Sequence, residues 1–117
     1  MKTVLILKGL PASGKSTFAR KLLEENKGAW KRLNKDELRL MLDNSQHSND
    51  NEKFIERVRD MMIIEALKAG KHVIIDDTNL SERPVDRITQ VVQKYAKDNG
   101  DQVKIEIRNR NQPRGIT

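Results

Sequence analysis

A buried strand that runs into a glycine loop and then into a helix constrains this chain more than any other feature. Residues 3–8, TVLILK, are largely aliphatic and are bounded by Gly9 and Pro11, which is typical of a central strand in a parallel sheet. From Gly14 the sequence becomes helical and continues to a stop signal at Gly28. A strand, a tight loop and a helix in this order predict the start of an α/β fold.

The rest of the chain continues this alternation. Helices are expected over 35–43, 52–69 and 81–100, strands over 29–33, 71–76 and 102–107, and a polar loop over 44–51. In the helix over 35–43, the apolar residues Leu38, Met41 and Leu42 fall at helical spacing. Residues 108–117 are too basic and too turn-prone to extend the last strand. The pattern predicts a single domain over 1–117, with a parallel sheet of about four strands between helices.

The glycine loop carries a phosphate-binding motif. Residues 9–16, GLPASGKS, match G-x-x-x-x-G-K-[ST] in full, and they lie between a strand and a helix, as the P-loop NTPase fold requires. The backbone N–H groups would cradle phosphate oxygens at the positive end of the helix dipole. The residues expected to bind a nucleoside triphosphate are Gly9, Pro11, Ala12, Ser13, Gly14, Lys15, Ser16 and Thr17. The alternative is a glycine turn that carries an exposed lysine.

Within this loop, individual side chains have distinct expected roles. Lys15 would span the β- and γ-phosphates, and the Ser16 hydroxyl would bind Mg²⁺. Thr17 would make a second contact. These roles are shared by kinases, GTPases, motors and regulators, so the motif alone does not identify the reaction.

Asp36 and Arg39 narrow the choice of reaction. They are three residues apart near the start of a predicted helix, so their side chains project from one face. The carboxylate could accept the proton of an attacking hydroxyl while the arginine holds an anionic group of the acceptor. An ordinary surface ion pair at this spacing is the alternative.

Two acids follow the predicted strand over 71–76. Asp76 and Asp77 fall at its carboxyl end, where open α/β sheets bind ligands. An acid at this position would steady Mg²⁺ or its water. Because side chains alternate along a strand, we expect only one of the two to face the metal.

Arginines are concentrated at the end of the chain. Arg108, Arg110 and Arg114 follow the last predicted strand. An arginine on a flexible segment can close over a transferring phosphoryl group and neutralise its charge. A disordered basic tail would have the same composition.

Composition limits the remaining function classes. The chain has no cysteine, which excludes thiolate catalysis, disulfides and Cys-ligated zinc, and fits a cytoplasmic protein. No apolar run approaches the ~20 residues of a membrane span, so no membrane association is expected. The net charge of +6 favours polyanionic partners, although a solvated basic surface would give the same value.

Four blocks, GLPASGKST, NKDELR, IIDDTNLSER and RNQPRG, resemble the 5′-OH polynucleotide kinase family within the ATP-dependent P-loop kinases. The resemblance implies ATP and Mg²⁺ as cofactors, with Lys15 and Ser16 contacting the phosphates and the metal. It implies Asp36 as the general base and Arg39 as the contact to the acceptor's phosphate. Asp77 matches the acid of the family's D-T-N block, and Asp76 precedes it. Arg110 and Arg114 match the lid arginines, with Arg114 at the transition-state contact.

The chain also departs from the family pattern. A further segment and helix normally separate the last strand from the lid arginines, so we expect a shortened lid and C-terminal region. The leading reading is an ATP-dependent phosphotransferase that phosphorylates the 5′-hydroxyl of DNA or RNA in end repair. The alternatives are a kinase of a small hydroxylated metabolite or nucleoside, and a non-catalytic nucleotide-binding module. The oligomeric state and the base of the donor nucleotide are left open.

Overall fold

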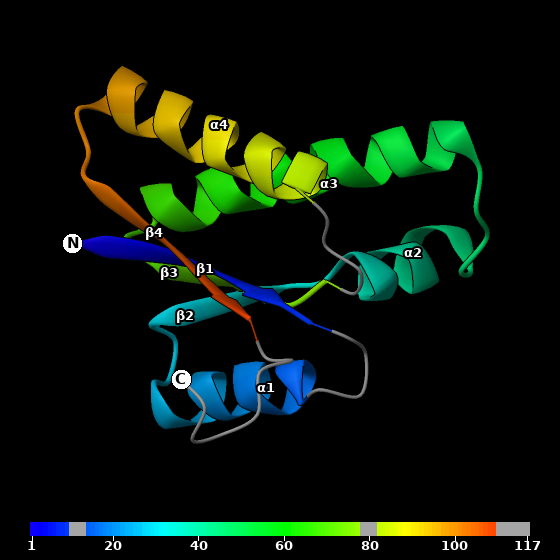
Figure 1. Ribbon diagram of the computed structural model, residues 1–117, viewed down its shortest axis with the longest axis horizontal. Coiled ribbons are helices and arrows are strands. Elements are labelled where there is room, and N and C mark those ends of the chain that lie inside the picture. The colour runs from blue at the N-terminus through cyan, green and yellow to red at the C-terminus, as the bar shows by residue number, and fades with distance from the viewer. Residues whose placement is uncertain (10–13, 78–81, 110–117) are drawn as a thin grey trace.

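The central sheet of this computed structural model, which describes residues 1–9, 14–77 and 82–109, is entirely parallel in the described part of the chain. Its strands lie in the order β2-β3-β1-β4 (Figure 1). They are β1 (Lys2–Lys8), β2 (Trp30–Leu33), β3 (His72–Ile75) and β4 (Val103–Asn109). The parallel sheet predicted from the alternating pattern is therefore confirmed.

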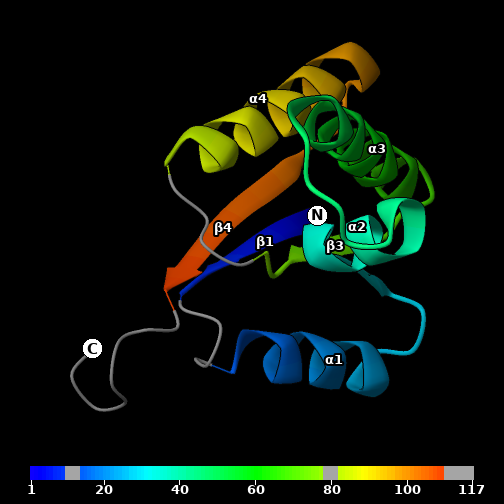
Figure 2. The same ribbon diagram turned by 90° about the vertical axis from the view of Figure 1, so that its right-hand side faces the viewer.

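Helices cover both faces of the sheet. They are α1 (Lys15–Glu25), α2 (Lys35–Asp43), α3 (Asn49–Lys68) and α4 (Glu82–Asn99). Figure 2 shows α1 on one face and α3 and α4 together on the other. None of these helices, within the described ranges, combines the length and apolar character needed to cross a membrane.

Side-chain alternation along β1 explains the two-sided packing. Val4 and Ile6 are fully buried against the layer of α3 and α4, whereas Leu5 and Leu7 belong to the smaller cluster under α1. A strand buried on both faces needs the continuous aliphatic run seen in the sequence. Each such side chain contributes roughly 1.5–3 kcal/mol by burial.

The strands end at one edge of the sheet, and the helices begin there. In Figure 1 the strands point towards the side on which α1, α3 and α4 start. The connection from β1 leads past β3 to β2, whereas the connection from β3 leads past β1 to β4. The order therefore reverses between β1 and β3, and such a switch point is where open α/β sheets bind ligands.

Two expected boundaries were wrong. The polar loop predicted over 44–51 ends earlier, because Ser48 caps α3 by accepting a hydrogen bond from the Asn51 N–H at 3.0 Å. The last strand does not stop at 107, because Arg108 and Asn109 continue β4 opposite Leu7 and Lys8 of β1. The backbone of β1 offers partners to the end of the strand, so the basic character of this segment does not prevent pairing.

The apolar face expected on α2 is only partly buried. Leu38 packs into the protein, but Met41 and Leu42 are 71% and 42% exposed. The helix lies at the end of the sheet rather than over one of its faces (Figure 1). Its position is set instead by polar contacts at its first turn.

Candidate functional site

Glycine fixes both ends of the phosphate-binding loop. Gly9 has φ 146° and Gly14 has φ 85°, values that residues with a Cβ rarely adopt. The chain thus leaves β1 and enters α1 through two turns that require glycine. The predicted loop residues Pro11, Ala12 and Ser13 lie outside the described residues.

The first turn of α1 is suited to an anion. It carries no acidic side chain, whereas the first turns of α2, α3 and α4 each carry at least one. The Phe18 N–H is the donor that closes the first turn, to the Gly14 carbonyl at 3.0 Å. Ser16 is partly exposed and Thr17 is exposed at this end. Unpaired N–H groups and the helix dipole favour a phosphate here.

Lys15 ties the ends of β1 and β3 together. Its ammonium donates to the Gly9 carbonyl at 2.8 Å and to the Asp77 carbonyl at 2.6 Å, and the residue is 2% exposed. Burial lowers the pKa of Lys15, while the charges of Asp76, Asp77 and Asp36 act in the opposite direction. The sequence reading that left Lys15 as an exposed surface lysine does not fit this geometry.

Asp76 holds neighbouring elements of the site together by hydrogen bonds. The residue is fully buried, and its Oδ2 accepts from Arg32 Nε at 2.8 Å while its Oδ1 accepts from Asn34 Nδ2 at 2.9 Å. Asn34 in turn caps α2 by accepting from the Glu37 N–H at 3.0 Å. Both carboxylate oxygens are therefore occupied, and they join β3 to β2 and to the start of α2.

Asp77 has one oxygen left over. Its Oδ1 accepts from the Lys35 N–H at 2.6 Å, whereas its buried Oδ2 has no hydrogen-bond partner among the described residues. This Oδ2 forms an ion pair with Arg59 Nη1 of α3, at 3.5 Å. Burial raises the pKa of Asp77, and the Lys35 N–H and Arg59 oppose this. Asp77 thus orients the first turn of α2 and presents an unsatisfied oxygen.

Asp36 and Arg39 do form the ion pair that their spacing allows. Arg39 Nη1 lies 2.5 Å from Asp36 Oδ1, and the Asp36 side chain is 51% exposed. The same guanidinium is held from α3 by Glu52, with Arg39 Nη2 donating to Glu52 Oε1 at 2.7 Å. The hydrogen bond to Glu52 raises the pKa of Arg39, and the one from Arg39 lowers the pKa of Glu52. The pair is therefore part of a fixed network of three residues rather than an isolated surface contact.

The donor set suits a magnesium ion that is shared with phosphate. No group of three or more His, Asp or Glu side chains in the described ranges could hold a metal by itself. Mg²⁺ commonly takes one or two protein oxygens and completes its coordination with water and substrate phosphates. The Oδ2 of Asp77, which accepts no hydrogen bond from the described residues, and the hydroxyl of Ser16 fit that role, whereas both oxygens of Asp76 already accept a hydrogen bond.

The fold therefore brings together most of the predicted residues that it describes. Gly9, Gly14, Lys15, Asp36, Asp76 and Asp77 all lie where strands end and helices begin. Arg110 and Arg114 lie outside the described residues. Arg108, grouped with them in the sequence, belongs to β4, where it donates to Glu106 and lies over the Phe18 ring.

Two residues of the network were missed by the sequence reading. Arg59 falls midway between the buried Ile55 and Ile63, four residues from each, and is itself fully buried. A charge in the apolar stripe of a helix is the signal that could have revealed it. Glu52 carries no such signal, because an acid in the first turn of α3 reads as an ordinary helix-terminal charge.

Comparison with known proteins gives matches to a family model and to solved structures. A family model described as an AAA domain matches residues 4–98. The structure resembles a chain of the Pnkp1/Rnl/Hen1 complex with a TM-score of 0.78 and 34% identity, over 96% of this chain and 36% of that one. A second structure, of the Pnkp1/Rnl/Hen1 RNA repair complex, gives 0.72 and 34%, over 91% and 32%. The chain thus spans about a third of the length of these two relatives.

A more distant likeness concerns the fold alone. The APS kinase CysC of Mycobacterium tuberculosis, in complex with AMPPNP and APS, gives a TM-score of 0.58 at 23% identity, over 97% of this chain and 64% of that one. No curated protein matches the chain significantly.

Proposed function

The chain belongs to the AAA domain family and has the fold of the P-loop kinases, and from this premise we propose that it transfers the γ-phosphoryl group of ATP to the 5′-hydroxyl of a polynucleotide. The proposal draws on the four sequence blocks and on the similarity to a chain of an RNA repair complex. The observation that carries it is Asp36, a half-exposed carboxylate that Arg39 holds by an ion pair at the start of α2, three residues after the end of β2. We extend the proposal to the whole of 1–117 as one kinase domain.

The nucleotide would bind at the start of α1. Lys15 would turn from the carbonyls of Gly9 and Asp77 to the β- and γ-phosphates, which exchanges two neutral acceptors for charged ones. The N–H groups of the loop and of the first turn would hold the remaining oxygens. Mg²⁺, held by Ser16 and Asp77, would supply neutralisation of charge on the phosphates.

Asp36 would act as the general base. Its carboxylate accepts the proton of the 5′-hydroxyl as that oxygen bonds to the γ-phosphorus, while the bond from the γ-phosphorus to the β–γ bridging oxygen breaks and ADP leaves. Arg39 would hold the acceptor's first phosphate. Three of its donor contacts already go to Asp36 and Glu52, so the guanidinium is oriented before the acceptor binds.

Closure over the transferring group is assigned to the lid arginines. The strand before Arg110 ends at Asn109, which pairs with Lys8 one residue before the glycine loop. The described part of the chain therefore ends beside the proposed nucleotide site, one residue before Arg110. We propose Arg114 for the transition-state contact.

The test is transfer of labelled γ-phosphate from ATP, with Mg²⁺, to a 5′-OH oligonucleotide. Asp36→Asn keeps the shape of the side chain but removes the base, and we expect transfer to fall by about 10²–10⁴ while ATP affinity is retained. Asp50→Asn, an exposed acid in the first turn of α3, is the matched control. Transfer that persists in Asp36→Asn would refute Asp36 as the base, and wild-type transfer only to a small hydroxylated metabolite would refute the polynucleotide acceptor.

A further inference from the structure

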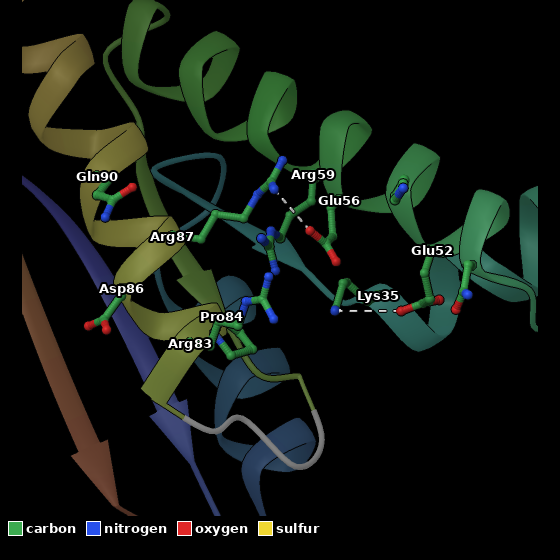
Figure 3. A pocket seen from close by; sticks show the side chains of 11 residues that line it. Lys35, Glu52, Glu56, Arg59, Arg83, Pro84, Asp86, Arg87 and Gln90 are labelled. Carbon is green, nitrogen blue, oxygen red and sulfur yellow. Dashed lines mark ion pairs between the residues drawn. The ribbon is translucent and has the colours of Figure 1, made fainter.

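A groove opens between the N-terminal halves of α3 and α4, next to the start of α2. It has a volume of about 660 Å³, within the range of about 300–1,000 Å³ that ligand sites occupy. Its lining residues are Lys35, Asn49, Glu52, Lys53, Glu56, Arg59, Arg83, Pro84, Asp86, Arg87 and Gln90. Figure 3 shows Arg59 and Arg87 pointing between the two helices, with Arg83 and Lys35 nearby.

Positive side chains outnumber negative ones in the lining of this groove. Two of the acids in the lining are already engaged, Glu52 by Arg39 and Glu56 by Arg87 at 3.1 Å. Asp86 points away from the arginines (Figure 3). Lys53 and Arg83, both exposed, make no ion pair with any residue in the described ranges. The groove therefore keeps cations that are available to an anionic ligand.

Arg59 adds a buried donor to the groove. Its side chain is 1% exposed, and Nη1 has no hydrogen-bond partner among the described residues. Its contacts with Asp77 at 3.5 Å and Asp60 at 3.3 Å are long for charged hydrogen bonds. A buried guanidinium with a donor left over is unfavourable unless a further acceptor approaches.

We propose that this groove binds the phosphodiester groups of the acceptor strand on the 3′ side of the reacting nucleotide. The inference rests on the proposed function, and Lys35 provides the connection. Lys35 lines the groove and immediately precedes Asp36, so a strand whose 5′ end lies at Asp36 has its next phosphates within reach of the groove.

The lining also indicates how the strand is read. No aromatic side chain is present among the described lining residues, so the groove offers no platform on which bases could stack. Contacts of cations with phosphates position a strand without reading its sequence. The groove therefore predicts selection for acceptor length rather than for base sequence.

The experiment compares the double variant Lys53→Ala/Arg83→Ala with the wild-type chain. Binding of 5′-OH oligonucleotides from two to six nucleotides is followed by fluorescence anisotropy across a salt series. We expect the affinity for the hexanucleotide to fall about tenfold and the salt slope to become shallower by about 1.4, the value for two phosphate contacts on a single strand. Lys68→Ala/Lys97→Ala removes two exposed cations from the same helices outside the groove, and this control should bind as the wild type does.

Failure of the groove and failure of the kinase proposal give different results. A nucleoside 3′-monophosphate cannot reach the groove. The inference would be overturned if Lys53→Ala/Arg83→Ala lost affinity equally for this ligand and for the hexanucleotide, or if its affinity for the hexanucleotide did not change. If the wild type transfers no phosphate to any 5′-hydroxyl but binds oligonucleotides with the predicted length and salt dependence, the groove stands and the kinase proposal fails. If Lys53→Ala/Arg83→Ala and the control Lys68→Ala/Lys97→Ala transfer phosphate equally well, the kinase proposal stands and the groove proposal fails.

Discussion

Arg59→Met tests whether the buried pair of Arg59 and Asp77 supports the site. Methionine fills a similar volume without the charge. The pair is separated by 3.5 Å, and at an effective dielectric constant of about 20 the lost attraction is about 5 kcal/mol. Removal of a buried guanidinium also relieves a desolvation penalty of several kcal/mol. We therefore expect a net loss of about 2–3 kcal/mol in the free energy of unfolding, or roughly 10 °C in Tm.

The other contacts of both residues limit this loss. Asp77 Oδ1 keeps its hydrogen bond from the Lys35 N–H, and Asp60 keeps its ion pair with Arg87 at 3.0 Å. The uncompensated group is thus the Asp77 carboxylate. A carboxyl whose pKa is raised in the folded state destabilises the protein above that pKa and ceases to do so as the pH falls towards the unfolded value of about 4. The destabilisation by Arg59→Met should therefore be smaller at pH 4.5 than at pH 7.

Urea unfolding of four proteins measures this effect: the wild type, Arg59→Met, Asp77→Asn and the double variant. We expect the double variant to be less destabilised than the sum of the single variants by about 2 kcal/mol. Additive losses, or a loss in Arg59→Met that does not change with pH, would refute the reasoning.

Three further predictions concern individual site residues. Lys15→Met should weaken AMPPNP binding by roughly 100-fold, because the charge that would meet the phosphates is lost, and calorimetry measures this; an unchanged affinity would contradict the assignment. Asp77→Asn should raise the Mg²⁺ concentration for half-maximal transfer more than Asp76→Asn does, since of the two only Asp77 has an oxygen that accepts no hydrogen bond from the described residues; equal shifts in a magnesium titration would contradict it. Glu52→Gln should raise the acceptor KM by loosening Arg39. Because Arg39 lowers the pKa of Glu52, this variant should also lose less stability than the wild type as the pH falls from about 5 to 3; parallel stability curves would count against the network.

The sequence was sufficient for the fold, and it indicated where along the chain the residues of the candidate site lie, because the signals involved are local. The aliphatic run of β1, the glycines at 9 and 14 and the acids after β3 each indicate a structure from a few neighbouring residues. Parallel pairing then brings the ends of the strands together, so residues distant in sequence share one edge. Local signals could not locate the end of β4, because its last two residues are in the strand only through their pairing with β1, which extends to Lys8.

The division of labour between Asp76 and Asp77 could not be predicted. Their adjacency indicates only that their side chains differ in direction. Which of the two acids has an oxygen for the metal depends on Arg32 of the neighbouring strand and on Asn34, which follows that strand. These two residues donate to the two oxygens of Asp76. Arg59 reaches Asp77 from α3, and no pattern around either residue specifies that long-range contact.

The most direct test of the central claim is to locate the phosphate in the product. A 5′-OH oligonucleotide and the same oligonucleotide already phosphorylated at its 5′ end are each incubated with ATP, Mg²⁺ and the protein, and the products are analysed by mass spectrometry after digestion from each end. We predict one added phosphoryl group, on the 5′-terminal oxygen of the first oligonucleotide only. Phosphate at another position, or none on either oligonucleotide while ATP is bound, would contradict the assignment of a polynucleotide 5′-hydroxyl kinase.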